Sequence, residues 1–245
     1  MKKCFLGLIV TIVTVSMLFV LVGCTKETPA EYFDYEKDDN HIIITGLVKT
    51  DLEKIVIPER IEGSFVTEID RSAFKDCTSL TNVTIPENVT EIDRSAFSGC
   101  TSLSTVTIPD SVKEISHRAF ADCTSLTSIT IPEGVTRISA FSGCTSLKNV
   151  TIPESVTEIE SSAFSDCTSL TNVTIPDSVT EIGPYAFADC TSLTSITIPD
   201  SVTAIGMHAF LGCTNLTNVT IPDSVESIGW GAFEGTGVKL PERFN

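Results

Sequence analysis

Basic residues and the side chains used most often in catalysis are scarce in this chain. Lys and Arg number 16 against 32 Asp and Glu, so the formal net charge at pH 7 is -16. Nucleic acid and anionic lipid surfaces attract a basic face, and this balance therefore excludes nucleic acid as a partner. There is one Trp, and the histidines are only His41, His117 and His208. The chain therefore has few of the residues that enzyme active sites use most often.

The N-terminus has the pattern of an export signal. Lys2 and Lys3 precede an apolar run over residues 4–20, which is followed by Leu21-Val22-Gly23-Cys24. A basic start, an apolar stretch and small residues at its end predict a signal peptide over residues 1–23. The tetrad resembles the lipobox of bacterial lipoproteins, and this resemblance implies lipidation of Cys24. An uncleaved membrane anchor is the alternative. Residues 24–40 are polar and acidic, which predicts a tether.

A single motif recurs through most of the remaining chain. Apolar-Pro pairs recur mostly every 23 residues, and cysteine and phenylalanine keep the same step. The prolines are Pro58, Pro86, Pro109, Pro132, Pro153, Pro176, Pro199 and Pro222. The phenylalanines are Phe74, Phe97, Phe120, Phe141, Phe164, Phe187, Phe210 and Phe233. A period of this length with apolar residues in constant positions predicts a repeat solenoid.

One turn of the repeat can be interpreted from its alternation. Val83 and Ile85 alternate with polar residues, as in a strand with one buried face, and Pro86 ends that strand because it has no N–H. Residues 89–92 form a second short extended run. The residue before each repeated cysteine is always Asp or Gly, which predicts a turn with a left-handed or otherwise unusual backbone. Because one turn buries too little apolar surface to offset its ordering entropy, neighbouring turns must stack in register.

The phrase AFxxCTSLTxVTIPxSVTxI resembles the BspA-type leucine-rich repeats of bacterial surface proteins, over about residues 42–241. The resemblance implies a mainly β, arc-shaped solenoid with a parallel sheet on its concave side and short β or 3₁₀ turns on its convex side. We expect an N-terminal cap and a divergent first repeat over 41–75, repeats of about 23 residues over 76–232, and a C-terminal cap over 233–245. Within that last cap, residues 238–241 are expected to form a short closing strand.

One copy of the repeat is two residues shorter than the others. The segment Ile138-Ser139-Ala140-Phe141 has lost these residues between its isoleucine and its phenylalanine. A regular helix would be rotated by such a loss, so we expect an adaptable turn there. The strand register on either side should survive.

Several repeated side chains could carry chemistry, and each has a simpler interpretation. The stacked cysteines are expected to be buried thiols, because the strand spacing exceeds the Cβ separation that a disulfide prefers. Acids that follow the prolines are expected to be solvated turn residues. His117 and His208 lie four turns apart, too far to share a metal or substrate. We therefore expect no enzyme, no cofactor and no metal site.

The outward positions of the strands remain as the candidate binding surface. They form an uncharged strip of hydroxyls and amides, although strand propensity alone also favours threonine there. The residues of this strip are Asn82, Thr84, Thr105, Thr107, Ser128, Thr130, Asn149, Thr151, Asn172, Thr174, Ser195, Thr197, Asn218 and Thr220. A second contact patch is expected near Tyr185, Met207 and His208, with Trp230 as its anchor. Partial packing of these residues against the neighbouring turn is the alternative.

Repetition of one weak contact suits a repetitive partner through avidity, and it suits a compact ligand poorly. The leading hypothesis is a lipid-anchored, adhesin-like binding protein on the bacterial cell or outer membrane. The resemblance implies attachment to host matrix proteins, glycans or other cells. A structural surface component without a dedicated ligand is the alternative. An ice- or crystal-face binder is the least favoured class, because curvature would spoil lattice matching.

Overall fold

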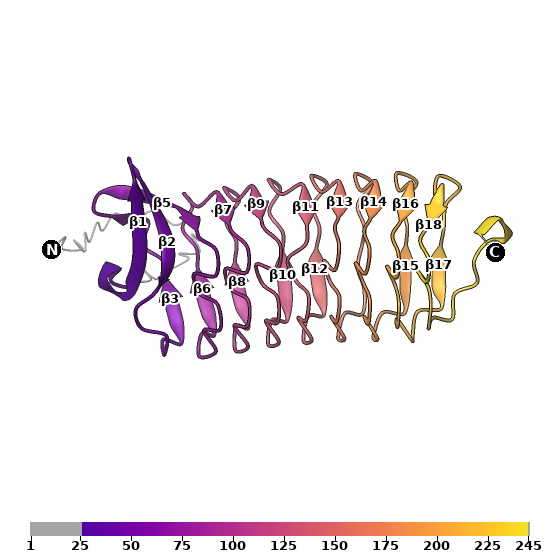
Figure 1. Cartoon of the computed structure of the whole chain (residues 1–245), viewed down its shortest axis with the longest axis horizontal. Helices are drawn as coiled ribbons and strands as arrows, with labels where there is room; N and C mark the ends of the chain where they lie inside the picture. The colour runs from indigo at the N-terminus through magenta and orange to yellow at the C-terminus, as the bar shows by residue number, and fades with distance from the viewer. Residues whose placement is uncertain (1–25, 245) are drawn as a thin grey trace, which may run out of the picture.

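The computed structural model describes residues 26–244, which form about eight stacked turns of a β-solenoid (Figure 1). The turns follow one another in an almost straight row in this view, with β1 (Phe33–Asp38) at one end of the row and η2 (Glu242–Phe244) at the other. Helix is limited to two 3₁₀ turns, η1 (Ala30–Tyr32) and η2 (Glu242–Phe244), within the described residues. No helix among the described residues is both long enough and apolar enough to cross a membrane.

Most turns contribute two short strands to two parallel ladders. The first ladder consists of β3 (Lys54–Val56), β6 (Asn82–Thr84), β8 (Thr105–Thr107), β10 (Ser128–Thr130), β12 (Asn149–Thr151), β15 (Ser195–Thr197) and β17 (Asn218–Thr220). The second consists of β5 (Ser64–Ile69), β7 (Glu91–Ile92), β9 (Glu114–Ile115), β11 (Arg137–Ile138), β13 (Glu158–Ile159), β14 (Glu181–Ile182), β16 (Ala204–Ile205) and β18 (Ser227–Ile228). Equivalent residues pair with each other, for example Asn82 with Thr105.

A stack of phenylalanine rings runs through the core. The rings at the repeated position lie nearly parallel, with adjacent centroids 4.9 Å to 5.7 Å apart between Phe74 and Phe233. Leucine, valine and isoleucine from both strands surround the stack and are almost all buried. The side chains at each repeated position are buried against their equivalents in the neighbouring turns, and this burial supplies the stability that an isolated turn lacks. The prediction that like residues lie above like residues is confirmed.

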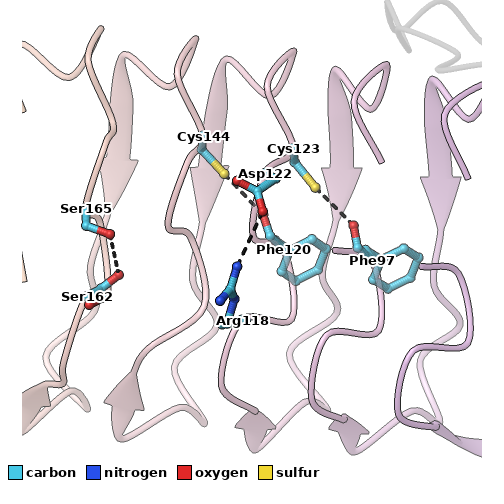
Figure 2. A network of polar contacts seen from close by, with 8 residues as sticks. All are labelled: Phe97, Arg118, Phe120, Asp122, Cys123, Cys144, Ser162 and Ser165. Carbon is cyan, nitrogen blue, oxygen red and sulfur yellow. Dashed lines mark hydrogen bonds and ion pairs between the residues drawn. The ribbon is translucent and has the colours of Figure 1, made fainter. Parts of the chain in front are cut away.

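The seven repeated cysteines form a second internal column, and all are free thiols. Each sulfur from the second copy onward donates to the phenylalanine carbonyl of the preceding turn, as Figure 2 shows for Cys123 and Cys144 (3.3 Å and 3.2 Å). Burial raises the pKa of Cys100 and Cys144 to about 12. These cysteines are therefore packing residues that satisfy a buried carbonyl, as expected from the strand spacing.

The Asp or Gly before each cysteine has the left-handed backbone that the sequence predicts. The φ angles at these seven positions are all positive, and range from 58° at Asp76 to 76° at Gly99. All three glycines at this position are also favoured by space, because a Cβ on Gly99, Gly143 or Gly212 would overlap the aspartate carboxylate of the turn before. Only Asp, Asn and Gly adopt this conformation at low cost, which explains the restriction to two residue types.

The N-terminal cap begins earlier than the sequence predicts. Residues 30–38 were expected to belong to the acidic tether over 24–40, but they form η1 and β1 (Phe33–Asp38). Strand β1 pairs antiparallel with β2 (His41–Leu47), which pairs in turn with β5. Phe33 is 3% exposed and packs edge-on against Phe74. The tether interpretation is wrong for this part because one buried aromatic and the pairing with β2 outweigh the local acidity.

The extra residues of the first repeat form a hairpin, since β4 (Arg60–Ile61) pairs antiparallel with the start of β5. Glu62 and Gly63 connect the two strands with positive φ angles of 49° and 82°. This is the turn geometry that suits the twist of a two-residue hairpin. The insertion therefore lies within the N-terminal cap, as the predicted boundary of 41–75 implies.

At the other end, the expected closing strand is absent. Residues 238–241 have no strand pairing, and the chain continues into η2, which projects beyond the last turn in Figure 1. The outermost apolar residues Ile221 and Ile228 are consequently only partly buried. The strand prediction was wrong because the chain leaves the stack after Gly237, whose N–H donates to the carbonyl of Leu216 at 2.9 Å, and residues 238–241 do not pair with β17.

The shortened copy keeps the register of its neighbours, as predicted. Strand β10 pairs with β12 and β11 with β13 at equivalent residues. The shorter turn still makes the hydrogen bond that the other copies make. The N–H of Phe120 donates to the carbonyl of Ala140, as the N–H of Phe97 donates to the carbonyl of Ala119. Both ladders are interrupted on the N-terminal side of this copy. The first ladder has no pairing between β8 and β10, and the second has none between β9 and β11.

Candidate functional site

The outward strip lies on the solvent side of the first ladder. Twelve of its fourteen side chains are exposed, and Asn82 and Thr84 are half-buried. The residues between its two columns point inward, as Ile129 and Ile196 show with exposures of 4% each. The alternation predicted from sequence therefore places the strip where a partner can reach it.

Most of the strip makes no internal hydrogen bond. Asn82 Nδ2 donates to Thr105 Oγ1 at 2.7 Å, and Asn172 Nδ2 approaches Thr171 Oγ1 at 3.4 Å. Among residues 26–244, the other eleven strip side chains have no hydrogen-bond partner within the protein. Their donors and acceptors are therefore free to bind a ligand.

Other repeated hydroxyls in the same turns are used differently. Ser111, Ser155, Ser178 and Ser201 each donate to the valine carbonyl of the preceding turn, over 2.6 Å to 2.8 Å. Thr124 and its equivalents donate to threonine carbonyls over 3.3 Å to 3.5 Å. These columns hold the stack together. The strip differs from these columns because its side chains do not donate to carbonyls of the turn before.

The strip is a series of three segments, and this corrects the expectation of one continuous ladder. The first ladder divides into the sheets β3-β6-β8, β10-β12 and β15-β17. Asn172-Val173-Thr174 forms no strand, although the same tripeptide forms β6, β12 and β17. Because the local sequence is identical, the interruption arises from the stacking of turns and not from strand propensity.

Trp230 and its neighbours lie on a different edge of the turns. Trp230 is 74% exposed and Met207 is 43% exposed. Tyr185 and His208 are half-buried, with ring centroids 4.9 Å apart, and the His208 ring lies 4.7 Å from that of Trp230. The rings of Tyr185, His208 and Trp230 thus pack between turns, as the alternative interpretation expects, while Trp230 and Met207 stay exposed. Cys24, the predicted lipidation site, lies outside the described residues.

A group of carboxylates on the second ladder was not singled out from the sequence. Ligand oxygens of Glu68, Asp70 and Asp93 lie within 4.8 Å of one another. Glu68 and Glu91 pair across β5 and β7, and Glu91 pairs with Glu114 across β7 and β9. Partial burial, and then the neighbouring carboxylates, raise the pKa of Glu68 and of Glu91. Such like-charged pairs weaken a sheet.

The histidines do not form a catalytic group with a nucleophile in the part of the chain that the structure describes. Burial, followed by Arg94 and Arg118, lowers the pKa of His117. His208 contacts Tyr185 and lies 4.0 Å from Glu234, but no repeated serine or cysteine donates to it. The arrangement can bind and pack, and it offers no nucleophile with an adjacent base.

Comparison with known proteins agrees with this architecture. The sequence profile described as BspA type Leucine rich repeat region matches residues 47–140 and 137–242, in six copies. The chain belongs to the BspA-type leucine-rich-repeat family. No curated protein sequence matches it.

Solved structures of related proteins share the fold. The T. pallidum leucine-rich repeat protein TpLRR is 35% identical over 89% of this chain and 92% of its own, with a TM-score of 0.64. A leucine-rich repeat protein from Eubacterium ventriosum is 26% identical over 79% of this chain and 61% of its own, with a TM-score of 0.63. The pneumococcal vaccine antigen PcpA is 20% identical, covers 90% of this chain and 71% of its own, and has a TM-score of 0.61, which bears on fold alone.

Proposed function

We propose that this BspA-type repeat protein is a non-catalytic binding protein of the bacterial cell surface, anchored through a lipid on Cys24. Its strip attaches the cell to a repetitive partner, such as a glycan or a fibrous matrix protein. The family and the β-solenoid support a scaffold for binding. The export signal and lipobox resemblance in residues 1–24 support the anchor.

The observation that carries the proposal is the contrast between hydroxyl columns. Serine and threonine at three other repeated positions donate to carbonyls of the turn before, as Ser178 does to Val156 at 2.6 Å, Thr191 to Thr168 at 3.4 Å and Thr180 to Thr157 at 3.2 Å. The strip side chains are equally regular but are exposed and mostly unbonded. One hydrogen bond contributes about 0.5–1.5 kcal/mol, so useful affinity requires several turns together.

The test is binding of the purified chain to immobilised matrix proteins and neutral glycans. Replacement of Thr107, Thr130 and Thr151 by Lys places bulk and charge on the strip in three successive turns and should strongly weaken binding. The matched control replaces Thr78, Thr101 and Thr214 by Lys, which are exposed threonines outside the strip whose hydroxyls make no hydrogen bond within the described residues. Equal loss in both variants would show that net charge, and not the strip, controls attachment.

A deletion tests the role of repetition. Removing residues 154–199 takes out two turns and joins Pro153 to Asp200 in the phase of the repeat. We expect a moderate loss of affinity, because the remaining turns still offer equivalent contacts. Complete loss would indicate one local site within the deleted turns. Absence of any ligand for the parent chain would favour a structural coat component.

A further inference from the structure

One position in the repeat changes character along the solenoid. It lies three residues before each phenylalanine of the core stack. In the first three turns this position is Arg, Arg and His, and in the last three it is apolar and exposed. The first set is Arg71, Arg94 and His117, and the apolar set is Pro184, Met207 and Trp230. A contiguous apolar row on an otherwise polar surface is a mark of an interaction site.

The exposed indole of Trp230 is held by its neighbours. Its ring meets that of His208 nearly edge-on, at an interplanar angle of 63°. The Tyr185 hydroxyl and Nδ1 of His208 form a hydrogen bond of 2.7 Å, and Nε2 of the same ring lies 4.0 Å from Glu234 Oε2. An exposed aromatic side chain whose orientation is already set loses little conformational entropy on binding.

The backbone beneath these rings is unusual for aromatic residues. Outside the shortened copy, the position two residues before each phenylalanine has a φ between 56° and 64°, and it is otherwise Ser, Arg or Gly. Tyr185 and His208 occupy it in adjacent turns. Gly231 follows, and a Cβ there would overlap the His208 ring. Bulky residues in this conformation are rare, and such strain concentrates at functional sites.

Trp230 also stands at the rim of a cavity at the end of the stack. This cavity has a volume of about 910 Å³ and lies between the last turn and the C-terminal segment. Its apolar wall is formed by Ile228, Phe233, Val238, Leu240 and Phe244. Glu234 and Lys239 are the charged residues that line it. The volume is within the range of ligand pockets, and it suits apolar side chains.

We propose that this end of the solenoid is a second binding site, separate from the strip, for a protein segment in which apolar and basic side chains alternate. An apolar side chain enters the cavity, and a neighbouring Arg or Lys lies on the indole of Trp230 with its charge toward Glu234. Tryptophan is the best aromatic partner for a cation. The chain's net charge of -16 attracts a basic segment from a distance.

The binding assay uses the only tryptophan of the chain, Trp230, as its reporter. The full purified chain is titrated with the peptide Ac-GLRGLRG-amide, and the peptides GLEGLEG and GSRGSRG serve as charge and apolar controls. We expect a fluorescence change that saturates with GLRGLRG and at least tenfold weaker binding of both controls, about 1.4 kcal/mol. No saturable response to GLRGLRG up to about 1 mM overturns the proposal.

Variants followed by calorimetry assign the contacts. Trp230→Ala and Glu234→Gln alter exposed side chains, and each should weaken GLRGLRG binding about five- to tenfold. Glu87→Gln removes the same charge from an exposed turn distant in the stack and should change affinity less than about twofold. Lys239→Gln should tighten binding. Equal effects of Glu234→Gln and Glu87→Gln would reduce the interaction to general charge attraction and overturn the site.

Two further measurements distinguish this site from the strip and from a glycan site. The variant in which Lys replaces Thr107, Thr130 and Thr151 should bind GLRGLRG like the parent, since the strip is a different surface. Binding of GLRGLRG by this variant is expected whether or not the strip binds a partner, so failure of one proposal does not imply failure of the other. Neutral oligosaccharides should leave Trp230 fluorescence unchanged, and a saturable response to them with none to GLRGLRG overturns the basic-peptide assignment.

Discussion

Truncation of a ring in the middle of the phenylalanine stack should destabilise the protein more than truncation of the ring at its end. Phe164 is fully buried, and its ring lies 5.7 Å from Phe141 and 5.5 Å from Phe187. Phe233 is 8% exposed and has one ring neighbour, Phe210 at 5.1 Å. The same substitution to Ala therefore removes two ring contacts at one position and one at the other.

The magnitude follows from two contributions. A buried Phe→Ala change costs about 3–5 kcal/mol through lost burial and the cavity that remains. Each stacked aromatic pair adds about 0.5–1.5 kcal/mol. The turns on both sides of Phe164 are held apart by their own ladders, so the space cannot close. We expect about 4–5 kcal/mol for Phe164→Ala and about 3 kcal/mol for Phe233→Ala.

Guanidinium chloride unfolding, followed by far-ultraviolet circular dichroism, measures both values. The comparison requires that each variant unfolds in a single transition with the slope of the parent, because repeat arrays can lose cooperativity. Equal losses for the two variants, or a loss below about 2 kcal/mol for Phe164→Ala, would refute the idea that the stacked core is the main source of stability.

Three further predictions concern thiols, charge and hydroxyls. Burial raises the pKa of Cys144 to about 12, so the repeated thiols should resist a thiol reagent at pH 8 until denaturant is added, and rapid labelling of the native chain would contradict this. The raised pKa of Glu91 means that its protonated form is favoured in the folded state. Its contribution to stability is present at low pH and is lost as pH rises through the folded pKa, so the melting temperature should rise from pH 7 to pH 5, and less so in Glu91→Gln. Ser178→Ala removes a 2.6 Å bond to a carbonyl and should cost about 1 kcal/mol in urea unfolding, whereas Ser195→Ala on the strip should stay within about 0.5 kcal/mol; equal costs would mean that the strip is structural too.

The sequence predicted the repeating interior well because each residue there serves the same contact in every turn. The phenylalanine stack, the cysteine column and the left-handed Asp or Gly all follow from strict spacing and simple sterics. The register across the shortened copy also followed, since the missing residues fall in a turn that only has to reach Phe141. Local patterns suffice where the neighbours of a residue are copies of itself.

The two ends were predicted poorly, for the same physical reason. Phe33 lies in an acidic segment that resembles a tether, and only the contact with Phe74 and the pairing of β1 with β2 make it part of the fold. The apolar residues Val238 and Leu240 resemble a closing strand, yet they line a cavity. End segments have no copy to stack upon on one side, so their pattern does not determine their partner.

By itself, the sequence determined that this chain is a stack of like turns, which face is buried and which residues meet water. Periodicity encodes these features directly, because each side chain repeats one environment. Only the tertiary structure decided where the strand ladders break, which hydroxyls bond to the turn before, and how Tyr185, His208 and Trp230 come into contact. Those outcomes depend on distances between turns, and residues 23 apart carry no local signal of them.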